Sequence, residues 1–149
     1  MPPSPSYFLA IDLGTTSAKV LIVQSDGVVI NRARAEFNLH HPQPTYAEAD
    51  PDDWWNCVTA LIHQVFDQSA VKPEQIAAIG LCGLMHALVP VDGDGVAVDW
   101  PMLWMDQRCK PQRDWLIERY GERIQAITGG HPSTTTSSPK LRWLVENRP

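Results

Sequence analysis

Three short apolar runs open the chain, and tight turns separate them. They cover Tyr7–Asp12, Lys19–Gln24 and Val28–Ala33 and are rich in β-branched residues. The segments between them, Leu13–Ser17 and Ser25–Gly27, consist of small and polar residues typical of hairpin turns. The pattern therefore predicts a three-stranded antiparallel meander.

A helical pattern and then a uniformly apolar run come next. Asp50 is placed to cap a helix that has Pro51 at its first position and continues to about Ser69. Its apolar residues recur at three- and four-residue spacings, a stripe that should face a sheet: Trp54, Trp55, Val58, Leu61, Ile62, Val65 and Phe66. The run Ile76–Cys82 predicts a buried strand parallel to the first strand. These elements predict an α/β fold with a mixed sheet.

The second half of the chain is less regular. Asp92–Gly95 is a hairpin turn signal between short apolar runs. Its Asp-x-Asp-Gly spacing lacks the closing Glu of a calcium-binding loop, so we predict a plain turn. The spacing of apolar residues predicts a helix over Gln112–Ile127 with a break at Gly121, and a last helix that begins at Pro139.

Composition and charge narrow the classes of function. The chain has 149 residues, 44% of them hydrophobic, and a net charge of -5 from 12 basic and 17 acidic side chains. Because the chain is acidic overall and has no run of basic residues, we do not expect nucleic acid or anionic membranes as partners. No signal peptide and no membrane-spanning run is found in the sequence, so we expect a cytoplasmic protein.

The termini and the cysteines add two expectations. Residues 1–6 are rich in proline and predict a disordered lead-in. Cys57, Cys82 and Cys109 are odd in number and far apart, a spacing that fits neither a metal site nor a disulfide framework. We therefore expect buried, reduced thiols.

The turn after the first strand carries the first candidate chemistry. Asp12 stands at the strand end, and Gly14, Thr15 and Thr16 come after it in the turn. Such a turn offers backbone N–H groups and hydroxyls to phosphate oxygens, with a carboxylate nearby for Mg²⁺. It is neither a Walker A loop nor a dinucleotide fingerprint. On spacing alone, an ordinary hairpin remains the favoured interpretation.

Downstream segments change this interpretation. With the first turn, they resemble, in order along residues 7–149, the FGGY family of carbohydrate kinases within the actin-like ATPase superfamily. The matching segments are the acidic helix start Tyr46–Trp55, the Met-His segment Ile79–His86, the Trp-x-Asp-x-Arg segment Leu103–Arg108 and the Pro-Lys-x-x-Trp segment Ser138–Leu144.

The resemblance implies an RNase H-like domain and transfer of the ATP γ-phosphate to a sugar hydroxyl. Residues 7–149 would form part of the N-terminal FGGY kinase domain, which would be cut short before it is complete. The second, ATP-binding domain would bear the catalytic base and the adenosine pocket, and nothing in this sequence matches it. We therefore expect the chain alone to be inactive. A non-catalytic sugar-binding or oligomerisation fragment is the alternative.

On the phosphate side, the resemblance assigns a role to each residue of the first turn. Asp12 would orient Mg²⁺ and its waters and so serve as both the catalytic and the metal-binding residue. Gly14, Thr15 and Thr16 would hold the transferring phosphate of ATP. Catalysis of this kind depends on positioning and charge stabilisation.

On the sugar side, the resemblance assigns substrate contacts to Met85, His86, Trp104 and Asp106. His86 would donate a side-chain hydrogen bond, Met85 would act through its backbone, Trp104 would form an apolar wall and Asp106 would accept from a hydroxyl. Three of the four have a structural alternative: a buried core histidine for His86, a core residue for Trp104, and pairing with Arg108 for Asp106.

The identity of the sugar is less defined. Glycerol kinases carry Arg-Glu where Met85 and His86 stand, which favours a ketopentose such as xylulose. Leu84, Met105 and Cys82 depart from the residues usual in xylulokinases and leave another sugar or polyol open. The resemblance also leaves room for a homodimer of the complete enzyme.

Overall fold

The computed structural model describes residues 6–148, and the predicted lead-in lies, apart from Ser6, outside these residues. The chain divides into two compact units. Unit 1 contains the residues up to Asn38 together with Asp52–Leu84, and unit 2 contains Leu39–Pro51 together with the residues from Met85 onward.

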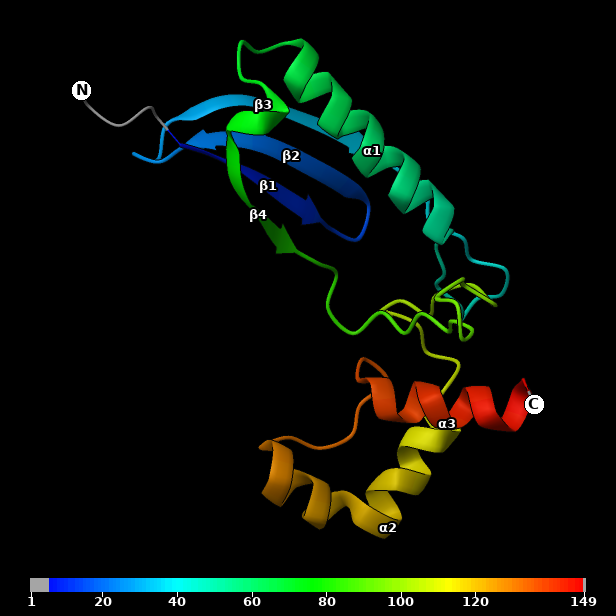
Figure 1. Cartoon of the computed structure of the whole chain (residues 1–149). Helices are drawn as coiled ribbons and strands as arrows, with labels where there is room; N and C mark the ends of the chain where they lie inside the picture. Colours follow the sequence, from blue (N-terminus) through cyan, green and yellow to red (C-terminus); the bar gives the residue numbers. More distant parts are fainter. Residues whose placement is uncertain (1–5, 149) are drawn as a thin grey trace. The chain divides into compact units, whose positions relative to one another are not determined.

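Unit 1 is built on a four-stranded mixed sheet (Figure 1). The strands are β1 (Tyr7–Leu13), β2 (Ser17–Gln24), β3 (Val29–Glu36) and β4 (Ile76–Cys82), in the order β3-β2-β1-β4. β1, β2 and β3 pair antiparallel, whereas β4 pairs parallel to β1. The predicted meander and the predicted parallel strand are both confirmed.

Helix α1 (Pro51–Asp67) covers one face of this sheet (Figure 1). It begins at the predicted proline and carries two acidic residues in its first turn, where the helix dipole favours negative charge. Leu61 and Val65 are buried against Leu9, Val20 and Ile22 of the sheet. A short 3-10 helix, residues 73–75, leads from α1 to β4.

One member of the predicted stripe does not face the sheet. The side chain of Trp55 is 73% exposed, whereas its neighbour Trp54 is buried. Consecutive residues of a helix point about 100° apart, so the two indoles cannot share one face. The inclusion of Trp55 in the core-facing stripe is therefore wrong.

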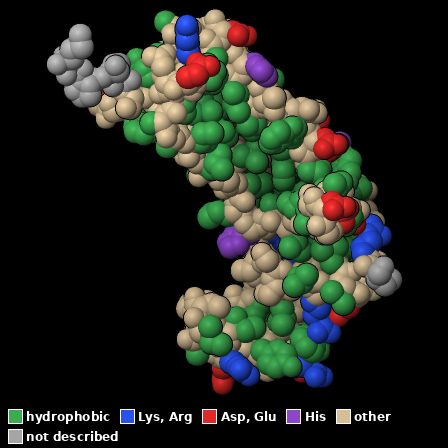
Figure 2. All heavy atoms as spheres, in the orientation of Figure 1, with side chains coloured by type: hydrophobic (Ala, Val, Ile, Leu, Met, Phe, Trp, Pro, Cys, Tyr) green, Lys and Arg blue, Asp and Glu red, His purple; other side chains and the backbone are tan. Residues whose placement is uncertain are grey.

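Strand β4 has the predicted bounds but not the predicted burial. It is one of the two edge strands of the sheet, with Ile79 60% and Leu81 78% exposed. Hydrophobic side chains are visible in Figure 2 over the part of the molecule that Figure 1 draws as the sheet. Cys82 is also exposed and Cys57 is partly exposed, so only Cys109 fits the expectation of buried thiols.

Unit 2 consists of irregular segments and two helices, α2 (Lys110–Thr128) and α3 (Ser137–Asn147). Helix α2 continues through Gly121, so the predicted break is wrong, and α3 begins two residues earlier than predicted. The turn at Asp92–Gly95 is confirmed, because Val96 N–H donates to Asp92 Oδ1 at 2.9 Å. Isolated bridges such as Leu88 with Met102 hold the other segments together.

Candidate phosphate and substrate sites

The turn between β1 and β2 holds the residues predicted to contact phosphate. Gly14 N–H donates to Ser17 O at 2.9 Å across the turn, so this N–H is not free, contrary to the expectation. A Cβ atom on Gly14 would lie 3.1 Å from the same oxygen, which explains why glycine suits the position. The carbonyl of Thr16 accepts from Phe37 N–H at 3.1 Å and ties the turn to the end of β3.

Asp12 lies near the end of β1, directly opposite Lys19 on β2. Lys19 Nζ donates to Asp12 Oδ2 at 2.6 Å, and the Asp12 side chain remains 41% exposed. Protein-bound Mg²⁺ commonly uses one or two carboxylates together with substrate phosphates and water. A partly exposed carboxylate beside a hydroxyl-rich turn fits that pattern. Among residues 6–148, no group of three or more His, Cys, Asp or Glu could hold a metal by itself.

Met85 and His86 form an exposed turn in unit 2. Met85 is 74% exposed, and His86 is exposed as well, so the buried core-histidine alternative is wrong. His86 has φ 58°, and among the described residues it is the one non-glycine residue with positive φ. This left-handed conformation is uncommon outside glycine and needs support from its surroundings.

That support comes from Lys140 on α3. Lys140 is fully buried, and its Nζ donates to His86 O at 2.7 Å, Thr135 O at 3.2 Å and Met102 O at 3.4 Å. Burial lowers the pKa of Lys140 to about 8, while Asp106 and Cys109 favour the charged form. The ammonium group therefore joins three separate segments through their carbonyl oxygens.

Trp104 and Trp143 differ in their exposure. Trp104 is 42% exposed, so the simple core alternative is wrong for this residue. Trp143 is buried with Met102 and Cys109 and belongs to the core of unit 2, as the sequence favoured. Tyr46 packs edge-on against Trp143, with ring centroids 6.2 Å apart.

Asp106 is the centre of a buried ion-pair network. Its Oδ2 accepts from Ala47 N–H at 2.8 Å, and Arg108 binds both carboxylate oxygens at 2.7 to 3.0 Å. Arg108 Nη2 also contacts Glu48 Oε1 at 2.5 Å, and the guanidinium lies over the Tyr46 ring at 3.6 Å. The predicted pairing of Asp106 with Arg108 is thus observed. Acceptance of a substrate hydroxyl by Asp106 stays a prediction and would require this network to open.

The network also explains the charge state of Arg108. Burial alone would lower the pKa of Arg108, but the hydrogen bonds to Asp106 and Glu48 outweigh burial and raise the pKa above its ordinary value. The guanidinium therefore remains charged at every pH at which the protein is folded. Residues 45–48 and 103–108, far apart in the sequence, are held together by this side chain and by backbone hydrogen bonds such as Leu103 N–H to Ala47 O at 2.9 Å and Gln107 N–H to Thr45 O at 2.8 Å.

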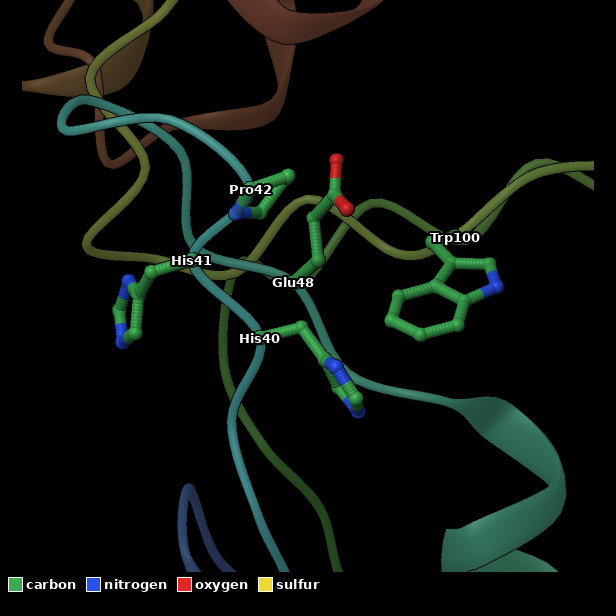
Figure 3. Close-up of a pocket in the computed structure, with 5 residues that line it drawn as sticks. All are labelled: His40, His41, Pro42, Glu48 and Trp100. Atoms are coloured by element: carbon green, nitrogen blue, oxygen red, sulfur yellow. The ribbon is translucent and has the colours of Figure 1, made fainter.

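An open pocket of about 440 Å³ lies beside this network in unit 2 (Figure 3). His40 points toward Trp100, with ring centroids 4.3 Å apart, while His41 points away from it. Glu48 also lines the pocket, but its carboxylate is neutralised by Arg108. Met85, His86, Trp104 and Asp106, all described residues, do not line it, so the pocket and the predicted sugar contacts are separate features.

Two residues with clear structural roles received no role from the sequence. Glu48 sits between the buried Ala47 and Ala49, and its partner Arg108 is 60 residues away. Lys140 has a detectable signal, because Trp143 and Leu144 come after it at the three- and four-residue spacings of a single helix face. A lysine on an apolar helix face is a sign of a buried cation.

Comparisons with known proteins cover nearly the whole chain. Residues 7–149 match the profile described as "FGGY family of carbohydrate kinases, N-terminal domain". A glycerol kinase from Saccharolobus islandicus is 34% identical over 147 residues, which are 98% of this chain and 29% of that protein. The chain thus spans less than a third of the relatives that it matches.

Solved structures agree with the sequence matches. A xylulose kinase from Rhodospirillum rubrum superposes with a TM-score of 0.87 at 27% identity, over 96% of this chain and 30% of that one. A gluconate kinase from Lactobacillus acidophilus superposes with a TM-score of 0.86 at 25% identity, over 97% and 29%. No helix among the described residues is long and apolar enough to span a membrane.

Proposed function

We propose a function from the premise that this chain belongs to the FGGY family of carbohydrate kinases. The chain would supply the sugar contacts and the first phosphate-binding turn of an ATP-dependent kinase for a ketopentose such as xylulose. Its mixed sheet and helices have the actin-like ATPase (RNase H-like) fold of the family's N-terminal domain. The term complete kinase denotes this chain joined to the second domain that the family provides.

The observation that carries the proposal is the exposed turn Met85–His86. Sugar recognition combines apolar area with a few directional hydrogen bonds. His86 offers an accessible ring nitrogen, and Trp104 and Met85 offer exposed apolar surface in the same unit. In this proposal Asp106 would accept from a sugar hydroxyl once its contacts with Arg108 open.

The proposal assigns the β1–β2 turn to the phosphates of ATP. Thr15 and Thr16 would hold the transferring phosphoryl group through hydroxyls and backbone, Gly14 would let the turn close beside it through its bond to Ser17 O, and Asp12 would hold Mg²⁺ and its waters. When bound, ATP supplies the phosphoryl group, and its Mg²⁺ neutralises the negative charge on that group. The chain's own residues contribute position and electrostatic stabilisation.

Glycerol is the competing substrate. Curated relatives are named glycerol kinases, and xylulose kinases are among the solved structures that superpose well. The Met-His pair in place of the Arg-Glu pair of glycerol kinases supports the ketopentose. The test is kcat/KM of the complete kinase for D-xylulose, glycerol and gluconate. A higher value for glycerol than for D-xylulose would overturn the choice of sugar and leave the kinase assignment intact.

We expect the 149-residue chain alone to show no sugar kinase activity. A general base must reach the hydroxyl proton, and the family places that base and the adenosine pocket in the second domain. The measurement is ATP-dependent phosphorylation of D-xylulose and glycerol by the purified chain. Turnover above a buffer blank would contradict the expectation. The coding sequence downstream of Pro149 separates a kinase from a non-catalytic fragment, because only a kinase continues into the second domain.

We also expect His86→Ala to raise the KM of the complete kinase for its sugar by about 3- to 10-fold. This corresponds to the ~0.5 to 1.5 kcal/mol that one hydrogen bond contributes. The KM for ATP should change less than about twofold, since His86 would contact only the sugar. His63→Ala, which removes an exposed histidine of α1, is the matched control. Unaltered sugar kinetics in His86→Ala would remove His86 from the site.

The proposed partners derive from the same assignment. A small-molecule sugar and ATP with Mg²⁺ are the ligands, and a cytoplasmic location suits both. The acidic charge gives no support to nucleic acid or an anionic membrane as a partner. A homodimer of the complete kinase stays a prediction, and sedimentation of the complete protein tests it.

A further inference from the structure

The buried ammonium group of Lys140 has no obvious value for stability alone. Its Nζ meets three carbonyl oxygens, one for each N–H donor that a lysine has. Burial of a charge is costly, and apolar residues of similar size often replace buried ions without loss of stability. The ammonium group fixes the position of the carbonyl groups that it binds, which an apolar side chain cannot do.

The shortest of the three contacts is made to the residue with the least favourable backbone. Lys140 Nζ lies 2.7 Å from His86 O. With φ 58°, His86 is the one non-glycine residue with positive φ among residues 6–148. Of the other two carbonyls, that of Met102 belongs to the buried part of unit 2: Met102 N–H and O pair with Leu88, and Met102 is 1% exposed. The contact therefore connects an exposed, strained turn to a rigid core.

We propose that Lys140 is a positioning residue for the substrate, which holds the His86 carbonyl and thereby keeps the Met85–His86 turn in its left-handed conformation. The inference rests on the proposed function in one point, namely that the turn binds a sugar. The positioning itself concerns only Lys140 and His86. Without the ammonium group, the turn would relax to ordinary backbone angles and the two exposed side chains would change direction.

The first test concerns the backbone and needs no ligand. In the 149-residue chain, the ¹³C′ resonance of His86 should shift with pH, with a midpoint near pH 8, because burial lowers the pKa of Lys140 to about 8. The charged groups and the thiol that act on Lys140 are Asp106, Arg108 and Cys109, and His86, which carries the reporting carbonyl, has an imidazole of its own. Comparison with Lys140→Met separates a step due to Lys140 from one due to that imidazole. Burial raises the pKa of Cys109, so the thiol does not produce this step.

Variants identify the group responsible. Lys140→Met should abolish the step and move the His86 ¹³C′ resonance, whereas Lys110→Met, the same substitution at an exposed lysine of α2, should leave both unchanged. Where Lys140→Met fails to fold, the titration of the unaltered chain still decides. Absence of any step at or below the ordinary lysine pKa of 10.5, or its persistence in a folded Lys140→Met chain, overturns the inference.

The second test concerns the sugar. If the relaxed turn is competent in about a tenth of the molecules, the apparent affinity falls by about tenfold. In the complete kinase, Lys140→Met should therefore raise the KM for D-xylulose about tenfold while kcat and the KM for ATP change less than about twofold. For the unaltered enzyme the sugar KM should rise as the pH passes 8, and this rise should be absent from Lys140→Met. An unchanged sugar KM in a folded Lys140→Met kinase overturns the role in substrate positioning.

The two tests separate two kinds of failure. If the Met85 and His86 resonances of the unaltered chain do not respond to D-xylulose, glycerol or gluconate, and the complete kinase phosphorylates none of them, the proposed function is wrong. The pH-dependent shift of the His86 ¹³C′ resonance, and its loss in Lys140→Met, would still establish the positioning contact.

Discussion

Asp12→Asn is expected to lower kcat of the complete kinase by about 10² to 10³, the usual cost of removing one charge-stabilising group from a site of this kind. The carboxylate lies beside the hydroxyl-rich turn and is partly exposed, where, in the proposed function, it would act on bound Mg²⁺ and on phosphate charge. The sugar KM should change less than about twofold, since the proposed sugar contacts come from other segments. Steady-state kinetics with both substrates varied gives the two quantities separately.

A matched control separates catalysis from folding. Glu36→Gln removes another exposed, ion-paired carboxylate from the same sheet, where Glu36 pairs with Arg34. Exposed pairs contribute only about 0 to 1 kcal/mol, so both variants should fold like the unaltered protein. Near-normal kcat in Asp12→Asn would make the β1–β2 turn a structural hairpin only.

Arg108→Met should lower the free energy of unfolding of unit 2 by about 3 to 5 kcal/mol, because it leaves the carboxylates of Asp106 and Glu48 without their shared cation. The side chains of Arg108 and Asp106 are 4% and 0% exposed, so water cannot replace the lost contacts. Urea unfolding monitored by tryptophan fluorescence measures the effect, since Trp143 lies in the same core.

The control for this variant is Arg113→Met, which breaks the exposed pair of Arg113 with Asp114. Its cost should be about 0 to 1 kcal/mol. Neutralising the stranded carboxylates in the triple variant Arg108→Met, Asp106→Asn, Glu48→Gln should recover part of the loss. A change below about 1 kcal/mol in Arg108→Met would contradict the importance of the network.

Local patterns predicted the secondary structure of unit 1 well. Alternation and turn residues located β1, β2 and β3, and capping residues located the start of α1. The bounds of β4 were also correct, but its burial was not. An apolar run shows that a strand can be covered on both faces, whereas coverage depends on neighbours that the run itself does not specify.

The candidate site was less predictable because its geometry depends on distant residues. The network that holds Asp106 joins residues 47, 48 and 108, and the support of His86 comes from residue 140. No periodicity connects such positions. The resemblance identified Met85, His86 and Trp104 as candidate substrate contacts, yet it gave no sign that His86 has a left-handed backbone or that a buried ammonium group holds its carbonyl.

The sheet topology has a consequence for synthesis of the chain. β1, β2 and β3 are joined by short turns, and such hairpins close in about 1 to 10 μs. β4 pairs Ile76 with Tyr7, and closure of so long a loop must precede any gain from the pairing. We therefore expect the meander to form first as the chain leaves the ribosome. The edge of β1 that faces away from β2 would then keep its backbone groups unpaired, and accessible to other chains, until residues 76–82 emerge and pair with it.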